Sequence, residues 1–138
     1  MIPESARAVL ESDALAHIAT IDADGSPQVT LAWVGIDGDE IVFATLPDHR
    51  KLRNIRRDPR VTISIETPNR NEYGLQEYVV LYGRGRVEEG GAAEMLQRLA
   101  HTYIGPDVKF PPMPDPPPGY VTRVTVERVG GIGPWAKR

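Results

Sequence analysis

The stretch ATLPDHRKLRNIRRDPRV, residues 44–61, is expected to pass from a strand into a basic helix and back into a strand. Asp48 is placed to cap the start of the helix, and Asp58-Pro59 ends it, because a residue before proline avoids the helical conformation. Leu52 and Ile55 are three residues apart, so they share one apolar face. Another face carries Arg50, Arg53, Asn54 and Arg57. The stretch therefore predicts a strand whose end leads directly into a cation-bearing helix.

Positive charge is concentrated in this stretch. The whole chain has a formal net charge of -3, so it offers no general attraction to nucleic acid. Between residues 49 and 60, by contrast, the sequence contains several basic residues and one histidine but a single acid, Asp58. A helix N-terminus presents free N–H groups and partial positive charge, so Arg50 and Lys51 there make a good phosphate site. The alternatives are a solvated basic helix face, the usual meaning of a charge run, and a contact with a nucleic-acid backbone.

Strand-type segments flank the basic helix on both sides. The upstream strands are joined by Asp/Gly turns typical of hairpins, and the downstream strand over 77–88 contains Gly83 and Gly85, which indicate a bulge or a close backbone approach. The expected strands cover 16–21, 28–36, 40–46, 61–66, 77–88 and 120–129, with further helices at 3–11 and 92–104 and an extended polyproline crossing at 111–119. About six antiparallel strands and three helices in this order predict a mainly β fold, a barrel with helical insertions, rather than an alternating βαβ sheet.

Size and composition narrow the class of protein. A chain of 138 residues suits one domain over 1–138, to which a dimer interface would add useful burial. The absence of Cys excludes disulfides and a cysteine nucleophile. No apolar run is long enough for a membrane helix and the N-terminus lacks a signal pattern, so we expect a cytoplasmic protein without membrane contact. The three histidines show no metal-binding spacing and no nucleophile motif occurs, so we assign neither a metal nor a catalytic side chain.

The spacing of Thr45, Lys51, Asn54 and residues 57–61 resembles the signature of the split β-barrel flavin-binding proteins, the pyridoxamine 5′-phosphate oxidase-like family. Residues 15–29 are similar to the first hairpin of that family, and residues 78–87 are similar to its later glycine-containing strand. The resemblance implies a split β-barrel, a homodimer with two equivalent sites, and an oxidoreductase. Within the family the chain is similar to short members that use the deazaflavin coenzyme F420 rather than FMN.

The resemblance also implies where the cofactor would bind. Lys51, with His49 and Arg50, would hold the phosphate or acidic tail, and the ring would lie along residues 28–30 and 44–45. Trp135 either packs over the ring or anchors the C-terminus in the barrel mouth. The full set of cofactor-binding residues expected is Gln28, Thr30, Ala44, Thr45, His49, Arg50, Lys51, Asn54, Arg56 and Trp135.

The choice of cofactor depends on the anionic groups to be bound. The polyglutamate tail of F420 would suit the extra cations Arg53, Arg56 and Arg57, whereas FMN has one phosphate and needs fewer. His49 stands where we align a second phosphate-binding Arg in relatives. Acceptors of hydride would be small or planar molecules. The alternatives are an FMN-dependent oxidoreductase of the same fold and a non-catalytic carrier or sensor that binds flavin or haem.

Overall fold

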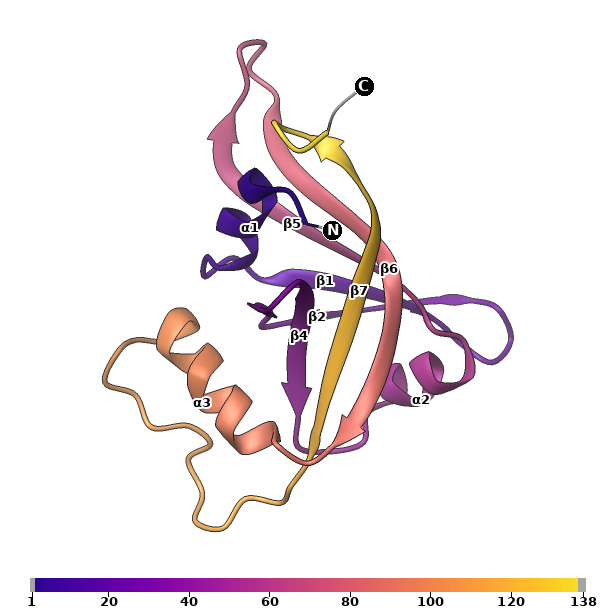
Figure 1. Ribbon diagram of the computed structural model, residues 1–138, viewed down its shortest axis with the longest axis vertical. Helices are drawn as coiled ribbons and strands as arrows, with labels where there is room; N and C mark the ends of the chain where they lie inside the picture. Colours follow the sequence, from indigo (N-terminus) through magenta and orange to yellow (C-terminus); the bar gives the residue numbers. More distant parts are fainter. Residues whose placement is uncertain (1, 137–138) are drawn as a thin grey trace.

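A single antiparallel sheet of seven strands, in the order β2-β1-β5-β6-β7-β4-β3, curls around the core in the computed structural model, which describes residues 2–136 (Figure 1). The elements are α1 (Glu4–Leu10), β1 (Ala16–Ile21), β2 (Pro27–Ala32), β3 (Gly35–Asp37), β4 (Glu40–Thr45), α2 (Arg50–Arg57), β5 (Arg60–Arg70), β6 (Gln76–Glu89), α3 (Ala92–Tyr103) and β7 (Tyr120–Ile132). The expected split β-barrel with three helical insertions is confirmed. No helix among the described residues is both long enough and apolar enough to cross a membrane.

The seventh strand arises because the segment expected as one strand over 28–36 divides at Trp33 and Val34 into β2 and β3. These two strands form the two edges of the sheet although they follow each other in the chain. The hydroxyl of Tyr103, at the end of α3, accepts a hydrogen bond from Val34 N (3.1 Å) and donates one to Ala14 O (2.9 Å). The Trp33 ring stacks on the Tyr103 ring, with centroids 5.5 Å apart. The end of α3 thus fixes the break that splits the barrel.

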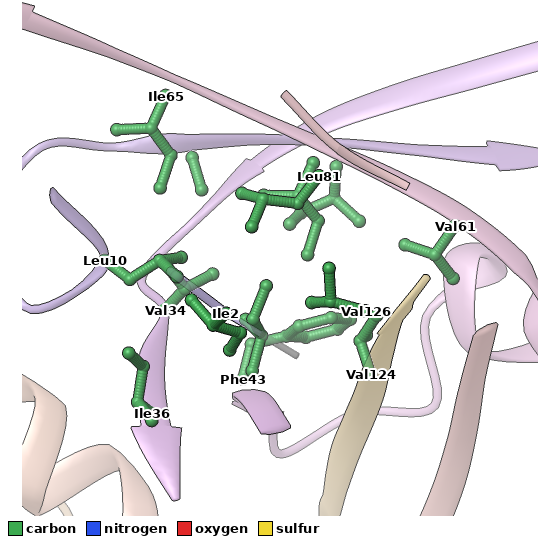
Figure 2. Packing of buried hydrophobic residues seen from close by; sticks show 14 of the residues in the cluster. Ile2, Leu10, Val34, Ile36, Phe43, Val61, Ile65, Leu81, Val124 and Val126 are labelled. Carbon is green, nitrogen blue, oxygen red and sulfur yellow. The ribbon is translucent and has the colours of Figure 1, made fainter. Parts of the chain in front are cut away.

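The core fills the inside of the curled sheet. Alternate residues of β5 point inward, so Val61, Ile63 and Ile65 are buried as the sequence pattern predicted. Phe43 on β4 lies among aliphatic side chains that include Val124 and Val126 of the neighbouring strand β7 (Figure 2). Burial of each such side chain contributes roughly 1.5–3 kcal/mol, so the core anchors every strand that carries the site described below.

Two glycines of β6 allow neighbouring segments to approach the strand closely. At Gly83 the register with β7 shifts, and a Cβ there would collide with the carbonyl oxygen of Thr125, which confirms the predicted irregularity. At Gly85 a Cβ would lie 3.1 Å from Ile55 of α2. The missing side chain therefore lets α2 pack closely on β6, and this contact sets the position of the basic helix.

The proline-rich segment between α3 and β7 crosses the surface without regular secondary structure, and it is bent rather than a straight polyproline helix. The Gln97 side chain ties it to α3 through Val108 O (3.0 Å) and Phe110 N (3.0 Å). The segment rejoins the sheet at Gly119, where a Cβ would lie 2.6 Å from Thr45 O. This glycine permits a close approach to the end of β4.

Candidate functional site

The start of α2 differs from the sequence prediction. The helix begins at Arg50 with His49 as N-cap residue, and no side chain caps it. The expected cap by Asp48 is wrong because the Asp48 carboxylate instead accepts two hydrogen bonds from Arg56, at 3.0 and 3.2 Å. Arg56 also lies over the Tyr120 ring, with its guanidinium 5.4 Å from the ring centroid. Arg56 thus braces the connection between β4 and α2 rather than facing an open site.

Lys51 is the most unusual side chain in this region because it is a buried cation. Only 6% of it is exposed, and its ammonium donates a hydrogen bond to Thr30 Oγ1 on β2 (3.1 Å). The ammonium also lies 5.5 Å from the centroid of the Phe43 ring. No carboxylate among residues 2–136 forms an ion pair with it, and burial lowers the pKa of Lys51 from its usual value. A buried charge without a counter-ion is costly, so Lys51 stands out from the other cations of α2.

Thr45 provides a second sign of an incomplete site. Its Oγ1 is buried and has no hydrogen-bond partner within the part of the chain that the structure describes. Thr45 ends β4 two residues after Phe43, so the two side chains point to the same side of the strand. Buried hydroxyls are nearly always satisfied. Thr45 Oγ1 is therefore a buried polar atom that can still take a hydrogen-bond partner.

Asn54 clasps α2 to the hairpin formed by β1 and β2. Its side chain is 2% exposed, and its amide nitrogen donates to Thr20 Oγ1 (3.1 Å) and Asp22 Oδ1 (2.8 Å). Its amide oxygen accepts a hydrogen bond from Arg57 (3.0 Å). The Gln28 side-chain oxygen accepts a hydrogen bond from Thr20 Oγ1 (3.0 Å). Asn54 and Gln28, both expected as cofactor contacts, thus lie in a network that holds the hairpin against the helix.

An open groove runs between this hairpin and the exposed face of α2. Its volume is about 500 Å³, and it is lined by Asp22, Ala23, Asp24, Arg50, Arg53, Asn54 and Arg57. The sequence analysis missed both carboxylates, which the fold brings to the basic helix. Arg50 Nε lies 3.7 Å from Asp22 Oδ1, whereas Arg53 and Arg57 form no ion pair with a carboxylate of residues 2–136. The groove is therefore less cationic than the run of arginines suggests.

Within one subunit, Trp135 lies away from this site. Its ring is 5% exposed, and its indole nitrogen donates to Tyr78 O (3.0 Å). Tyr78 pairs with Ile132 at the C-terminal end of β7, whereas α2 packs near Gly85 at the other end of β6 (Figure 1). The position of Trp135 corresponds to the terminal anchor, which was one of its two expected roles.

The outward side of the sheet carries an apolar surface. Val29 and Leu31 of β2 are 59% and 55% exposed, and Leu31 pairs with His17 of β1, which pairs with Ser64 of β5. Tyr78 and Tyr82 of β6 face the same side, and the guanidinium of Arg128 lies 3.9 Å from the Tyr82 ring centroid. A depression of about 520 Å³ on this side is lined by Ser64, Ile65, Glu66, Gln76, Tyr78 and Val80. We call the side formed by Val29, Leu31, His17, Ser64 and Tyr78 the outer face.

Among residues 2–136, no group of three or more His, Asp or Glu side chains is placed to hold a metal ion.

Comparisons with known proteins identify relatives of the whole fold. The family model described as pyridoxamine 5′-phosphate oxidase matches residues 2–133. A solved structure of an F420 reductase is 27% identical, with a TM-score of 0.76, covering 94% of this chain and 98% of that one. The Mycobacterium tuberculosis protein Rv2991 is 24% identical (TM-score 0.71, 95% and 84% covered), and HupZ of Group A Streptococcus is 20% identical (TM-score 0.67, 100% and 99% covered). These last two show the fold alone. No curated protein matches the chain at a significant level.

Proposed function

Because the chain belongs to the pyridoxamine 5′-phosphate oxidase family, we propose that it is an oxidoreductase in which Lys51 anchors the phosphate of a flavin-type cofactor. The observation that carries this proposal is the buried Lys51 ammonium, which has a hydroxyl partner but no carboxylate among residues 2–136. An anion that binds there would offset the cost of burying the charge.

The residues around Lys51 fit an anionic, partly apolar cofactor. Lys51 offers a point charge, and the exposed Arg50 offers the planar donor pair that suits a phosphate. The orphan Thr45 Oγ1 can donate or accept a hydrogen bond. We propose that Thr30, Ala44 and Thr45 line the cofactor, that His49 and Arg50 assist Lys51, and that Gln28 and Asn54 keep these groups in place.

A bound flavin or deazaflavin supplies hydride transfer, so the protein needs no nucleophile of its own. The residues of the chain then have to bind the cofactor, orient it and leave room for the acceptor. This division of tasks agrees with the absence of a nucleophile motif in the sequence.

We propose F420 as the cofactor, used to reduce a small or planar acceptor. Two observations support this choice. The F420 reductase is similar over nearly the full length of both chains. The groove also offers Arg53 and Arg57 to an anionic tail, because neither forms an ion pair with a carboxylate within residues 2–136. Arg53 donates a hydrogen bond to Asp48 O (2.6 Å), and Arg57 donates to Ile21 O (2.6 Å) and Asn54 Oδ1 (3.0 Å).

FMN is the second candidate, and a specific observation favours it. Arg56 is paired with Asp48, and Arg50 lies close to Asp22, so part of the positive charge expected for a long anionic tail is already neutralised. A single phosphate at Lys51 would then suffice.

We further propose that a second copy of the chain covers the outer face and completes the site. Exposed Val29 and Leu31 lie on β2, the strand whose opposite side presents Thr30 to Lys51. A symmetric contact through this face would bury apolar side chains and enclose the region next to the cofactor anchor.

A side-by-side titration of the purified protein with F420 and FMN tests the proposed function. We expect saturable binding of one or both, with F420 bound more tightly, followed by oxidation of the reduced cofactor by an acceptor. Failure to bind either cofactor contradicts the proposal, and binding without turnover under any acceptor indicates a carrier.

A further inference from the structure

Asp22 is a carboxylate that lines the groove beside the basic helix. The turn after β1 carries it to α2, where it lies 32 residues from Asn54 in sequence but 2.8 Å from the Asn54 amide nitrogen. Its backbone N–H donates to Ser26 O (2.8 Å), so the turn fixes its position. The Asp22 side chain lines the groove beside Arg50, and 23% of the side chain remains exposed.

Any anion that binds to Arg50 must share the guanidinium with Asp22. Arg50 Nε is 3.7 Å from Asp22 Oδ1, so a phosphate bound by the same guanidinium is exposed to the negative charge of that carboxylate. Asp22 Oδ1 is used by Asn54, while Oδ2 has no hydrogen-bond partner among residues 2–136. The second oxygen therefore repels a further negative group at this place and can accept a hydrogen bond from a neutral hydroxyl or amide.

We propose that Asp22 is a specificity determinant that limits the ligand beside Arg50 to one anionic group and rejects a second one directly attached to it. This inference rests on the proposed function, which places a phosphate-bearing cofactor at α2. It predicts that the site accepts a single phosphate group beside Arg50 and discriminates against a diphosphate.

The test replaces Asp22→Asn, which removes the charge but keeps an oxygen able to accept the hydrogen bond from Asn54. Asp24→Asn is the matched control. Asp24 lines the same groove and is ionised, since the hydrogen bond from the Ser26 backbone lowers the pKa of Asp24, and it has no ion pair with Arg50. Asparagine can likewise accept the Ser26 bond (2.9 Å) that Asp24 now accepts.

Calorimetric titration measures the affinities for inorganic phosphate and for pyrophosphate, and their ratio, in wild type and both variants. The experiment needs no flavin. We expect Asp22→Asn to shift the ratio toward pyrophosphate by about fivefold, because two unit charges roughly 4 Å apart interact by about 1 kcal/mol even in water. In Asp24→Asn the ratio is expected to change less than about twofold, because a more distant exposed charge is screened.

An unchanged ratio in Asp22→Asn overturns the inference, and so does an equal shift in both variants, which would indicate net charge alone. Absence of phosphate binding to the wild type also overturns it. These results are separable from the proposed function: cofactor binding without a change in the ratio leaves that function standing and removes only the role of Asp22.

Discussion

The Lys51 ammonium lies 3.1 Å from Thr30 Oγ1, and this hydrogen bond joins the basic helix α2 to the edge strand β2. The bond gives the charge a polar neighbour but no counter-ion. The buried face of α2 therefore holds a cation in a place where a purely structural helix would carry an apolar side chain. The predictions below follow from this arrangement and from the contacts around it.

Lys51→Met should not destabilise the protein in the absence of ligand. Replacing a buried, unpaired charge by an apolar side chain of similar length is expected to be neutral or stabilising, by about 1 kcal/mol at neutral pH. Thermal unfolding of both proteins, without phosphate in the buffer, measures this. A lower Tm in Lys51→Met would contradict the cost assigned to the buried ammonium.

The gain from Lys51→Met should also depend on pH. Because burial lowers the folded-state pKa of Lys51 below the unfolded value of 10.5, the unfolded chain binds more protons between the two pKa values. The unfolding free energy of the wild type therefore rises as the pH increases through that window. The destabilisation caused by the buried Lys51 charge is fully present below the folded-state pKa. The difference in unfolding free energy between wild type and Lys51→Met should shrink as pH approaches 10.5. A difference that grows with pH would refute the sign of the shift.

Asn54→Ala should destabilise the protein by about 1–3 kcal/mol, because Thr20 and Arg57 lose a partner in a largely buried network. Urea unfolding measures the loss. The control is Asn69→Ala on the exposed end of β5, which is expected to change stability by less than about 0.5 kcal/mol. Equal stability of the two variants would show that the clasp between α2 and the hairpin is unimportant.

The combined change Arg53→Ala and Arg57→Ala should weaken binding of F420 more than binding of FMN. Exposed ion pairs to a flexible tail contribute little each, so we expect a preferential loss of about three- to tenfold. Arg56→Ala serves as the control because Arg56 is held by Asp48. Fluorescence titration with both cofactors gives the two ratios. An equal loss for F420 and FMN would remove the reason for assigning the arginines to the tail.

Leu31→Glu should dissociate the proposed homodimer, because a charge would replace an exposed apolar side chain of the outer face. Sedimentation velocity should show a dimer for the wild type and a monomer for the variant. Met113→Glu, on the exposed proline-rich segment, is the matched control and should remain dimeric. A monomeric wild type, or a dimeric Leu31→Glu protein, would argue against the outer face as the interface.

The sequence alone was sufficient to predict the elements whose signals lie within a few neighbouring residues. Alternation in β5, the Asp/Gly turn before β2 and the apolar pair Leu52 and Ile55 on α2 each predicted a structure that is present. The family resemblance added the split of the barrel, which is now supported by the match over residues 2–133.

The composition of the site was harder to predict, because it depends on contacts between distant segments. Asp22 reaches the groove only through the pairing of β1 with β2 and the clasp by Asn54, and nothing near Arg50 in sequence signals it. The local pattern favoured Asp48 as a cap, but the Arg56 side chain, near the other end of α2, binds the Asp48 carboxylate instead. The number of unpaired cations on α2 was overestimated for this reason.

The most direct test is a cofactor titration of wild type, Lys51→Ala and Lys109→Ala, where Lys109 is an exposed lysine outside the site. Lys51→Ala is expected to weaken binding of F420 and of FMN by about 1–3 kcal/mol, the range for a charge-assisted hydrogen bond, while Lys109→Ala binds like wild type. If Lys51→Ala retains wild-type affinity for whichever cofactor binds, the buried lysine is not the anchor and the proposed site is wrong.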